Sequence, residues 1–285
     1  PIMVMNPEIR SVDQMIKYNL EPEVYSLEFL QGLDRAVQST YQFISHQLNL
    51  HIKIDTGMHR LGLLHEDLSD AIDLIKSNGL LRCQSVFSHL AASENPLHDD
   101  FTRNQIEQLI KAHQNIEEQL AYSIDKHILN SEGILRFPQA HFDMVRTGIG
   151  LYGFGNSKKE NVHFKPISTL KTVISQINSI EKGKSVGYNR AYKSDGFMKT
   201  ATLPIGHADG IGRQYGNGKG FVNIHGKPAP IIGNVCMDMI MVNITHIDCK
   251  EGDEVIVFGP EQTAEHLAET VNTISYELIT AISQR

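Results

Sequence analysis

Residues 49–62 read NLHIKIDTGMHRLG, and the polar end of this stretch indicates where a ligand site belongs in the predicted fold. Apolar and polar residues alternate up to Ile54, which predicts a strand. Lys53, Asp55 and Arg60 then gather charges of both signs around a tight polar turn at the strand end. Parallel α/β folds place their ligand sites at such ends. Taken alone, the pattern fits a solvated charged turn better than a site, so the rest of the chain has to decide.

The first half of the chain repeats the succession of a short apolar run and an amphipathic helix. Such alternation is typical of βαβ units around a parallel sheet. Polar clusters follow several successive strands and nothing indicates a reversal of strand order, so we expect a (β/α)8 TIM-type barrel rather than an open sheet. The strands fall short of eight, so we expect a barrel that lacks its N-terminal units. Strands are expected at residues 2–5, 24–25, 50–54, 83–89, 127–130 and 144–152.

The second half changes to closely spaced strands with glycine-containing turns, which predicts a mainly-β domain. The charged loop NSKKEN at residues 156–161 is a plausible linker, so we expect a partial barrel over residues 1–155 and a β-domain over residues 162–285. Thr263 is a good N-cap for one final helix. The expected strands lie at residues 169–180, 199–206, 220–225, 231–244 and 254–258.

Composition excludes several classes of function. A net charge of −7 argues against a nucleic-acid surface, because phosphate backbones require clustered Lys and Arg. No apolar run approaches the roughly 18 residues that a membrane crossing needs. The three scattered cysteines fit neither a disulfide framework nor a zinc site, so a reducing cytoplasm is the simplest location. Both ends of the chain look cut, and we expect a fragment.

Several polar residues that follow the expected strands are candidates for one site. His89 ends a strand, where it can carry a proton or organise hydrogen bonds, although a buried histidine satisfied by backbone is at least as good an interpretation. Asn130 and Ser131 follow another strand, where they can bind phosphate or simply cap a helix. Arg146 precedes Gly148, which lets backbone N–H groups approach a ligand, although Arg146 could instead pair with acids on a helix.

The β-domain holds a second polar cluster. His207 and Asp209 end one strand in the segment GHADG, and the segment CMDM at residues 236–239 interrupts another. A Cys-His-Asp set is compatible with a hydrolase or a metal site. The spacing matches no metal-ligand motif, however, and the chain has no GxSxG elbow.

Together these clusters resemble the alanine racemases, the fold-type III pyridoxal-phosphate enzymes. Eight segments occur in the family's order over almost the whole chain, which is far more specific than any one of them. The family's fold, an N-terminal (β/α)8 barrel with a C-terminal β-domain, agrees with the two parts predicted above. The texts PIMVMNPE and LEPEVYS look closest to racemase domains fused behind a cell-wall amino-acid ligase. The eight segments are HIKIDTGMHRLG, VFSHLAASE, HILNSEGILRF, VRTGIGLYG, VGYNRAY, IGHADG, PIIGNVCMDMIMVNIT and ISYE.

The resemblance implies roles for residues of the barrel. Arg60 would orient the substrate carboxylate and the second base, and His89 would support that base. Arg146 would face the pyridine nitrogen of pyridoxal 5'-phosphate (PLP), and its fixed positive charge would keep that nitrogen unprotonated. Lys53 matches a position that is often carbamylated in the family and that buttresses Arg60. The cofactor phosphate would be held by Ser131, Gly148, Ile149 and Tyr276, with Asn130 as a neighbouring candidate.

The resemblance also implies a substrate and an assembly. Met237 and Asp238 would reach the substrate from the partner subunit, so the family's site requires a homodimer. The implied reaction is the PLP-dependent interconversion of L-alanine and D-alanine, which supplies peptidoglycan precursors. A racemase of broader specificity and a non-catalytic PLP-binding or scaffold domain of a fusion protein both stay open as alternatives.

Two departures from the family pattern bear on activity. The family's Schiff-base lysine lies in a KANAYGHG-type segment, and this chain contains no such segment. We therefore expect the chain as given to be inactive and its parent protein to be active. Position 207 holds histidine where most relatives have the tyrosine that acts as second base. Because imidazole exchanges protons near neutral pH, we expect His207 to take that role. In the alternative, His207 merely packs and Tyr188, Tyr192 or Tyr215 reaches the site.

Overall fold

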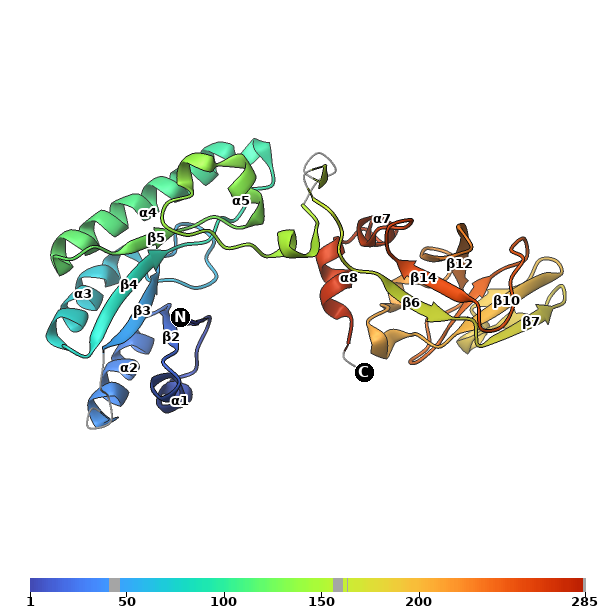
Figure 1. The fold of residues 1–285 in the computed structure, drawn as a ribbon, viewed down its shortest axis with the longest axis horizontal. Coiled ribbons are helices and arrows are strands. Elements are labelled where there is room, and N and C mark those ends of the chain that lie inside the picture. Colours follow the sequence, from blue (N-terminus) through green and yellow to red (C-terminus); the bar gives the residue numbers. More distant parts are fainter. Residues whose placement is uncertain (41–46, 156–160, 163, 284–285) are drawn as a thin grey trace. The chain divides into compact units, whose positions relative to one another are not determined.

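The computed structural model describes residues 1–40, 47–155, 161–162 and 164–283. The chain folds into two compact units, residues 1–148 and residues 149–285 (Figure 1). Most of the expected linker at 156–161 lies outside the described residues. Each unit has its own hydrophobic core.

Unit 1 is built on five parallel strands whose spatial order equals their order in the chain. This order has no reversal, which is how successive strands of a barrel are arranged and agrees with the prediction. The strands are β1 (Met3–Val4), β2 (Glu21–Val24), β3 (Leu48–Lys53), β4 (Leu81–Phe87) and β5 (Asp125–His127).

Helices of unit 1 alternate with the strands, and α3 and α4 lie along one side of β3, β4 and β5 in Figure 1. Their inward faces carry the apolar residues that the helical spacing predicts, such as Leu33 in α2 and Ile72 in α3, both fully buried. The helices are α1 (Val12–Lys17), α2 (Leu27–Thr40), α3 (Leu68–Ser77), α4 (Asp99–Leu120) and α5 (Ser131–Arg136).

The strand expected at residues 144–152 is not formed, so that prediction is wrong. Asp143, just before the segment, donates its N–H to the Lys126 carbonyl of β5 at 3.2 Å, and Arg146 donates its N–H to the Leu129 carbonyl, two residues beyond β5, at 3.0 Å. A parallel ladder needs donors two residues apart, whereas these two are three apart. A short 3₁₀ helix, η6 (Ile149–Tyr152), follows instead of a strand.

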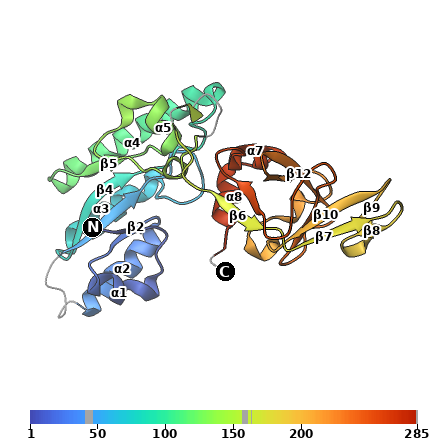
Figure 2. The same ribbon diagram turned by 45° about the vertical axis from the view of Figure 1, so that its right-hand side comes forward.

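Unit 2 is mainly β, as predicted. Seven strands form one antiparallel sheet in the order β6-β14-β11-β12-β13-β10-β7, and Figure 2 shows the β8–β9 hairpin beside β7 and β10. The strands are β6 (Leu170–Val173), β7 (Gln176–Ile180), β8 (Ser185–Val186), β9 (Tyr192–Lys193), β10 (Met198–Leu203), β11 (Phe221–Ile224), β12 (Lys227–Ile232), β13 (Ile240–Asn243) and β14 (Glu254–Phe258).

Three predictions for unit 2 need correction. The strand expected at residues 169–180 is divided into β6, which pairs with β14, and β7, which pairs with β10. The strand expected at residues 231–244 is divided into β12 and β13, because Gly233 adopts φ +64° and starts a loop that carries Cys236. The single final helix is divided into α7 (Ala264–Glu269) and α8 (Ser275–Ala281). The predicted cap is confirmed, since Thr263 Oγ1 accepts the His266 N–H at 3.1 Å. None of the described helices combines the length and apolar character that a membrane crossing requires.

Candidate active site

The turn after β3 is shaped by Asp55, as the sequence suggests. Its Oδ1 accepts the N–H groups of Gly57 and His59 at 2.9 and 3.1 Å, and its Oδ2 lies 3.2 Å from His59 Nδ1. Burial raises the pKa of Asp55, but the two backbone N–H groups and His59 outweigh it, so the pKa lies below its ordinary value. Asp55 is therefore a charged structural residue of the turn.

The same loop returns to the sheet at Gly62. This residue has φ +141°, and a Cβ there would lie 2.4 Å from the Asp55 nitrogen, so no other residue fits. Leu63 then pairs with the end of β3 through its N–H to the Lys53 carbonyl at 2.8 Å. Arg60, at the top of this loop, is exposed and makes no hydrogen bond or ion pair within the described part of the chain. Its guanidinium is free to receive a carboxylate.

Lys53 has a partner other than the one the resemblance implies. Its ammonium lies 2.9 Å from Glu23 Oε1, and the two side chains are buried. No ion pair or hydrogen bond joins Lys53 to Arg60 among the residues that the structure describes. The register explains the pairing, because Glu23 lies opposite His51 on the neighbouring strand β2 and so comes diagonally close to Lys53.

A chain of buried polar side chains crosses unit 1 from β2 to the segment after β5. His51 Nε2 lies 2.9 Å from Glu21 Oε2, and His51 Nδ1 lies 2.6 Å from Ser85 Oγ. Ser85 Oγ lies 3.1 Å from His127 Nε2, and His127 Nδ1 contacts the guanidinium of Arg146. The first four members come from four successive strands of the sheet.

One arrangement of protons pairs every donor in this chain with an acceptor. Arg146 has only donors, so His127 Nδ1 accepts and the ring carries its proton on Nε2. That N–H donates to Ser85, the Ser85 hydroxyl donates to His51, and His51 donates to the Glu21 carboxylate. Burial, followed by the charge of Arg146, lowers the pKa of His127 to about 3, which agrees with a neutral ring. The chain thus runs from a cation to an anion.

Arg146 is the centre of the site in unit 1. Besides His127, its guanidinium donates to the Ser88 carbonyl at 2.6 Å and to the Ile128 carbonyl at 3.3 Å, and it lies 3.2 Å from His89 Nδ1. Burial lowers the pKa of Arg146 to about 10, and Glu23 acts in the opposite direction, so the group stays charged at neutral pH. Its Nε–H finds no protein acceptor in the described ranges. This donor is available to an acceptor such as a pyridine nitrogen.

His89 is neutral and oriented by Arg146. Burial, followed by the charges of Arg146, Arg60 and Lys53, lowers the pKa of His89 to about 4. Since the Arg146 guanidinium donates to Nδ1, the His89 proton lies on Nε2. A neutral imidazole with a fixed N–H can support a base by donating a hydrogen bond, which is the role that the resemblance gives to His89.

The proposed phosphate-binding residues of unit 1 lie together. The Gly148 N–H donates to Ser131 Oγ at 2.9 Å, so a backbone N–H and a side-chain hydroxyl lie next to each other. Asn130 is the N-cap of α5, and its Oδ1 accepts the Gly133 N–H and the Ser93 hydroxyl, each at 2.9 Å. The helix-capping interpretation therefore holds for Asn130 rather than for Ser131.

The remaining candidates belong to unit 2. Ile149 is buried in its core, and the ring of Tyr276 lies 5.9 Å from that of Tyr152. His207 begins the short 3₁₀ helix η8 (His207–Asp209), where its backbone N–H donates to the Cys236 carbonyl at 2.9 Å.

His207 lines a cavity of about 350 Å³ within unit 2, together with Tyr215 and Glu277. Tyr188, Tyr192 and Tyr215 were the alternatives to His207 as second base, and of these three Tyr215 lines this cavity. Its side chain is buried, and burial, aided by the charge of Glu277, raises the pKa of Tyr215 to about 12. The phenol therefore keeps its proton at neutral pH.

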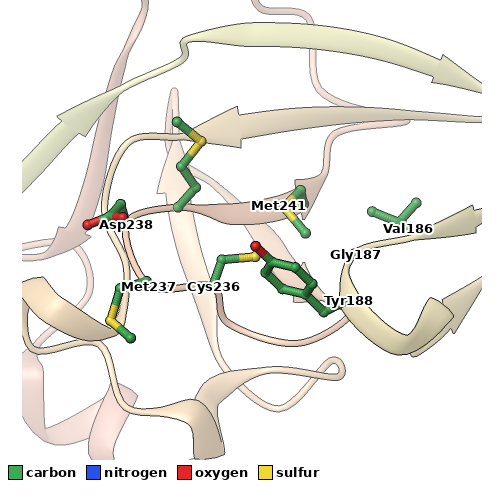
Figure 3. Close-up of a pocket in the computed structure, with 8 residues that line it drawn as sticks. Val186, Gly187, Tyr188, Cys236, Met237, Asp238 and Met241 are labelled. Carbon is green, nitrogen blue, oxygen red and sulfur yellow. The ribbon is translucent and has the colours of Figure 1, made fainter.

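Met237 and Asp238 line a different cavity of unit 2, of about 570 Å³. Figure 3 shows them on the loop that also carries Cys236, while Tyr188 and Met241 come from other segments. Met237 is 59% exposed, so its side chain is accessible to a ligand or to another chain.

Sequence reasoning missed the polar groups that hold the site from behind. Glu21, Glu23, His51, Ser85 and His127 are all buried in strands. The available signal was the polar half of the alternation, as at His51 and Lys53, from which we predicted only a strand. In a barrel, that half faces the interior.

Known proteins share both units of this chain. Residues 1–155 match the family described as "Alanine racemase, N-terminal domain", and residues 167–285 match "Alanine racemase, C-terminal domain". Alanine racemase 1 of Clostridium acetobutylicum is 34% identical over 296 residues, which cover 100% of this chain and 75% of the relative.

Solved structures agree. The alanine racemase of Clostridium difficile 630 has a TM-score of 0.88 and 33% identity, covering 100% of this chain and 74% of that one. The enzyme of the D-cycloserine producer Streptomyces lavendulae has a TM-score of 0.91 and 26% identity, covering 100% and 76%. These matches confirm the predicted barrel and β-domain, and they show that the chain belongs to the alanine racemase family, whose members are PLP-dependent isomerases.

Proposed function

We propose that this chain carries the cofactor and substrate residues for the interconversion of L-alanine and D-alanine, which supplies peptidoglycan precursors. The observation that carries the proposal is the environment of Arg146. Its guanidinium is held by His127, His89 and two strand-end carbonyls, while the Nε–H keeps no protein acceptor in the described ranges. These residues fit a group that presents a pyridine nitrogen.

PLP, when bound, supplies the electron-withdrawing ring that acidifies the Cα–H of an attached amino acid. Arg146 would donate to its pyridine nitrogen and, as a permanent cation, disfavour protonation of that nitrogen. Ser131 and Gly148 would give their hydroxyl and N–H to the phosphate, with Ile149 and Tyr276 contributing from unit 2. The proximity of Ser131 and Gly148 supports this, because the Gly148 N–H donates to Ser131 Oγ at 2.9 Å and both groups can therefore reach one phosphate.

The substrate would be handled by charged and titratable side chains of both units. Arg60 would bind the alanine carboxylate, for which its unpaired guanidinium is suited. His207 would exchange the proton at Cα as the second base, and the neutral imidazole of His89 would support that base. Met237 and Asp238 would contact the substrate from the partner subunit of a homodimer. The three free cysteines are compatible with a cytoplasmic location.

The chain contains no KANAYGHG-type lysine segment, and Lys53, a buried lysine of β3, is paired with Glu23. We therefore expect residues 1–285 with added PLP to form no D-alanine from L-alanine. The same chain preceded by a lysine-bearing segment is expected to racemise alanine in both directions. D-Alanine formation, measured with D-amino-acid oxidase, tests both expectations. Racemisation by residues 1–285 alone, or inactivity of the lysine-bearing protein, would refute them.

A further inference from the structure

Glu23 is a buried acid that the proposed mechanism does not use. It is 1% exposed, its Oε2 accepts the Asn6 N–H at 2.6 Å, and its Oε1 lies 2.9 Å from the ammonium of Lys53. A carboxylate placed so deeply in a core needs a counter-charge, and Lys53 supplies it. Asn6 therefore donates to one oxygen of Glu23, and Lys53 supplies the counter-charge beside the other.

Lys53 is equally enclosed. The residue is 4% exposed, and its ammonium lies 5.7 Å from the centre of the Phe87 ring, which the Arg146 guanidinium also approaches, at 5.2 Å. An aromatic face attracts a cation and repels an anion. Glu23 and Phe87 therefore each stabilise an ammonium at Lys53, and Glu23 does so as its ion-pair partner.

We propose that Glu23 is a positioning residue that holds Lys53 as a bare ammonium, and that its carboxylate supplies the negative charge that a carbamate on Lys53 would otherwise bring. The inference rests on the proposed function, because Lys53 matters here as a residue behind the proposed alanine site. The resemblance alone implies that Lys53 can carry a carbamate. Glu23, on the neighbouring strand β2, is the reason to expect an unmodified ammonium instead.

The chemistry explains why the pair excludes the modification. In carbamylation, the unprotonated amine attacks the carbon of CO2, a C–N bond forms, one C=O electron pair becomes the carbamate oxyanion, and a proton leaves to solvent. Here the amine would first have to give up the proton that faces Glu23. The product would then place a second anion beside a buried carboxylate, where like charges interact strongly.

Removal of the carboxylate should reverse both effects. In Glu23→Gln, the amide oxygen can still accept the Asn6 N–H, but Lys53 loses its counter-charge. A buried amine without a counter-charge favours the neutral form that reacts with CO2. Glu21→Gln is a matched control, because Glu21 is another buried acid of β2 but pairs with His51 rather than with Lys53.

The test equilibrates the whole chain with carbon-13-labelled bicarbonate and records the carbamate signal by carbon-13 NMR, which is independent of racemisation. We expect no signal from the wild-type protein or Glu21→Gln, and one carbamate per chain in Glu23→Gln that disappears in the double variant with Lys53→Arg. A wild-type signal that Lys53→Arg removes would overturn the proposal, as would a folded Glu23→Gln variant without a carbamate. The wild-type comparison remains decisive if Glu23→Gln does not fold.

Discussion

Replacing His127 with glutamine should make the protein less sensitive to acid. The pKa of His127 falls from 6.5 to about 3 on folding, because the ring is buried beside Arg146. Between these pH values the unfolded chain binds a proton that the folded chain does not bind. The free energy of unfolding therefore decreases as the pH falls below about 6.5, and the loss stops near pH 3.

The size of the effect follows from the shift. One pH unit within this window corresponds to about 1.4 kcal/mol, so His127 should account for about 2.5 kcal/mol of lost stability between pH 7 and pH 4.5. Glutamine does not titrate, but its amide can accept from Arg146 and donate to Ser85. The variant should therefore resemble the parent at pH 7 and lose less stability in acid.

The assay is urea unfolding followed by helical circular dichroism at several pH values, since the long helices α2, α3 and α4 all belong to unit 1. His89, whose pKa is lowered to about 4, adds a second contribution that His127→Gln leaves in place. His89→Gln therefore serves as the comparison that removes the other contribution. Equal acid sensitivity of the parent and His127→Gln would refute the assignment of a neutral, buried His127.

Three further results are expected. Gly62→Ala should destabilise the fold by about 2–4 kcal/mol in urea unfolding, because its Cβ would meet the Asp55 nitrogen at 2.4 Å, whereas Gly79→Ala, with open space around its Cβ, should cost less than about 1 kcal/mol. Ser131→Ala should weaken PLP binding about tenfold in a dialysis titration, the equivalent of one lost hydrogen bond, and unchanged binding would remove Ser131 from the phosphate site. In the lysine-bearing protein, His207→Ala should slow racemisation about 100-fold or more in both directions, and normal rates would transfer the second-base role to another residue.

Local patterns in the sequence predicted the elements that local physics determines. The strand before Asp55, the Asp55 turn and the Thr263 cap were predictable because each depends on neighbouring residues. The eight ordered motifs placed Arg146, His89 and Ser131 in one family site, and the structure brings Arg146 within 3.2 Å of His89.

The partners of these residues depend on the sheet and could not be read locally. Alternation in β3 predicted a strand but not the surroundings of His51 and Lys53, which are both buried. Their partners Glu21 and Glu23 lie on β2, and only the register between the two strands pairs them. The failure at residues 144–152 has the same origin, since an apolar run forms a strand only where a ladder partner is in register.

Cofactor binding by Arg146 is the central claim, and titration of the protein with PLP tests it most directly. Arg146→Gln removes the guanidinium, whereas Arg136→Gln removes an arginine that pairs with Asp99 instead. Loss of a charged donor is worth about 1.5–3 kcal/mol, so Arg146→Gln should weaken PLP binding about 10- to 100-fold while Arg136→Gln binds like the parent. Equal affinity of Arg146→Gln and the parent would contradict the account.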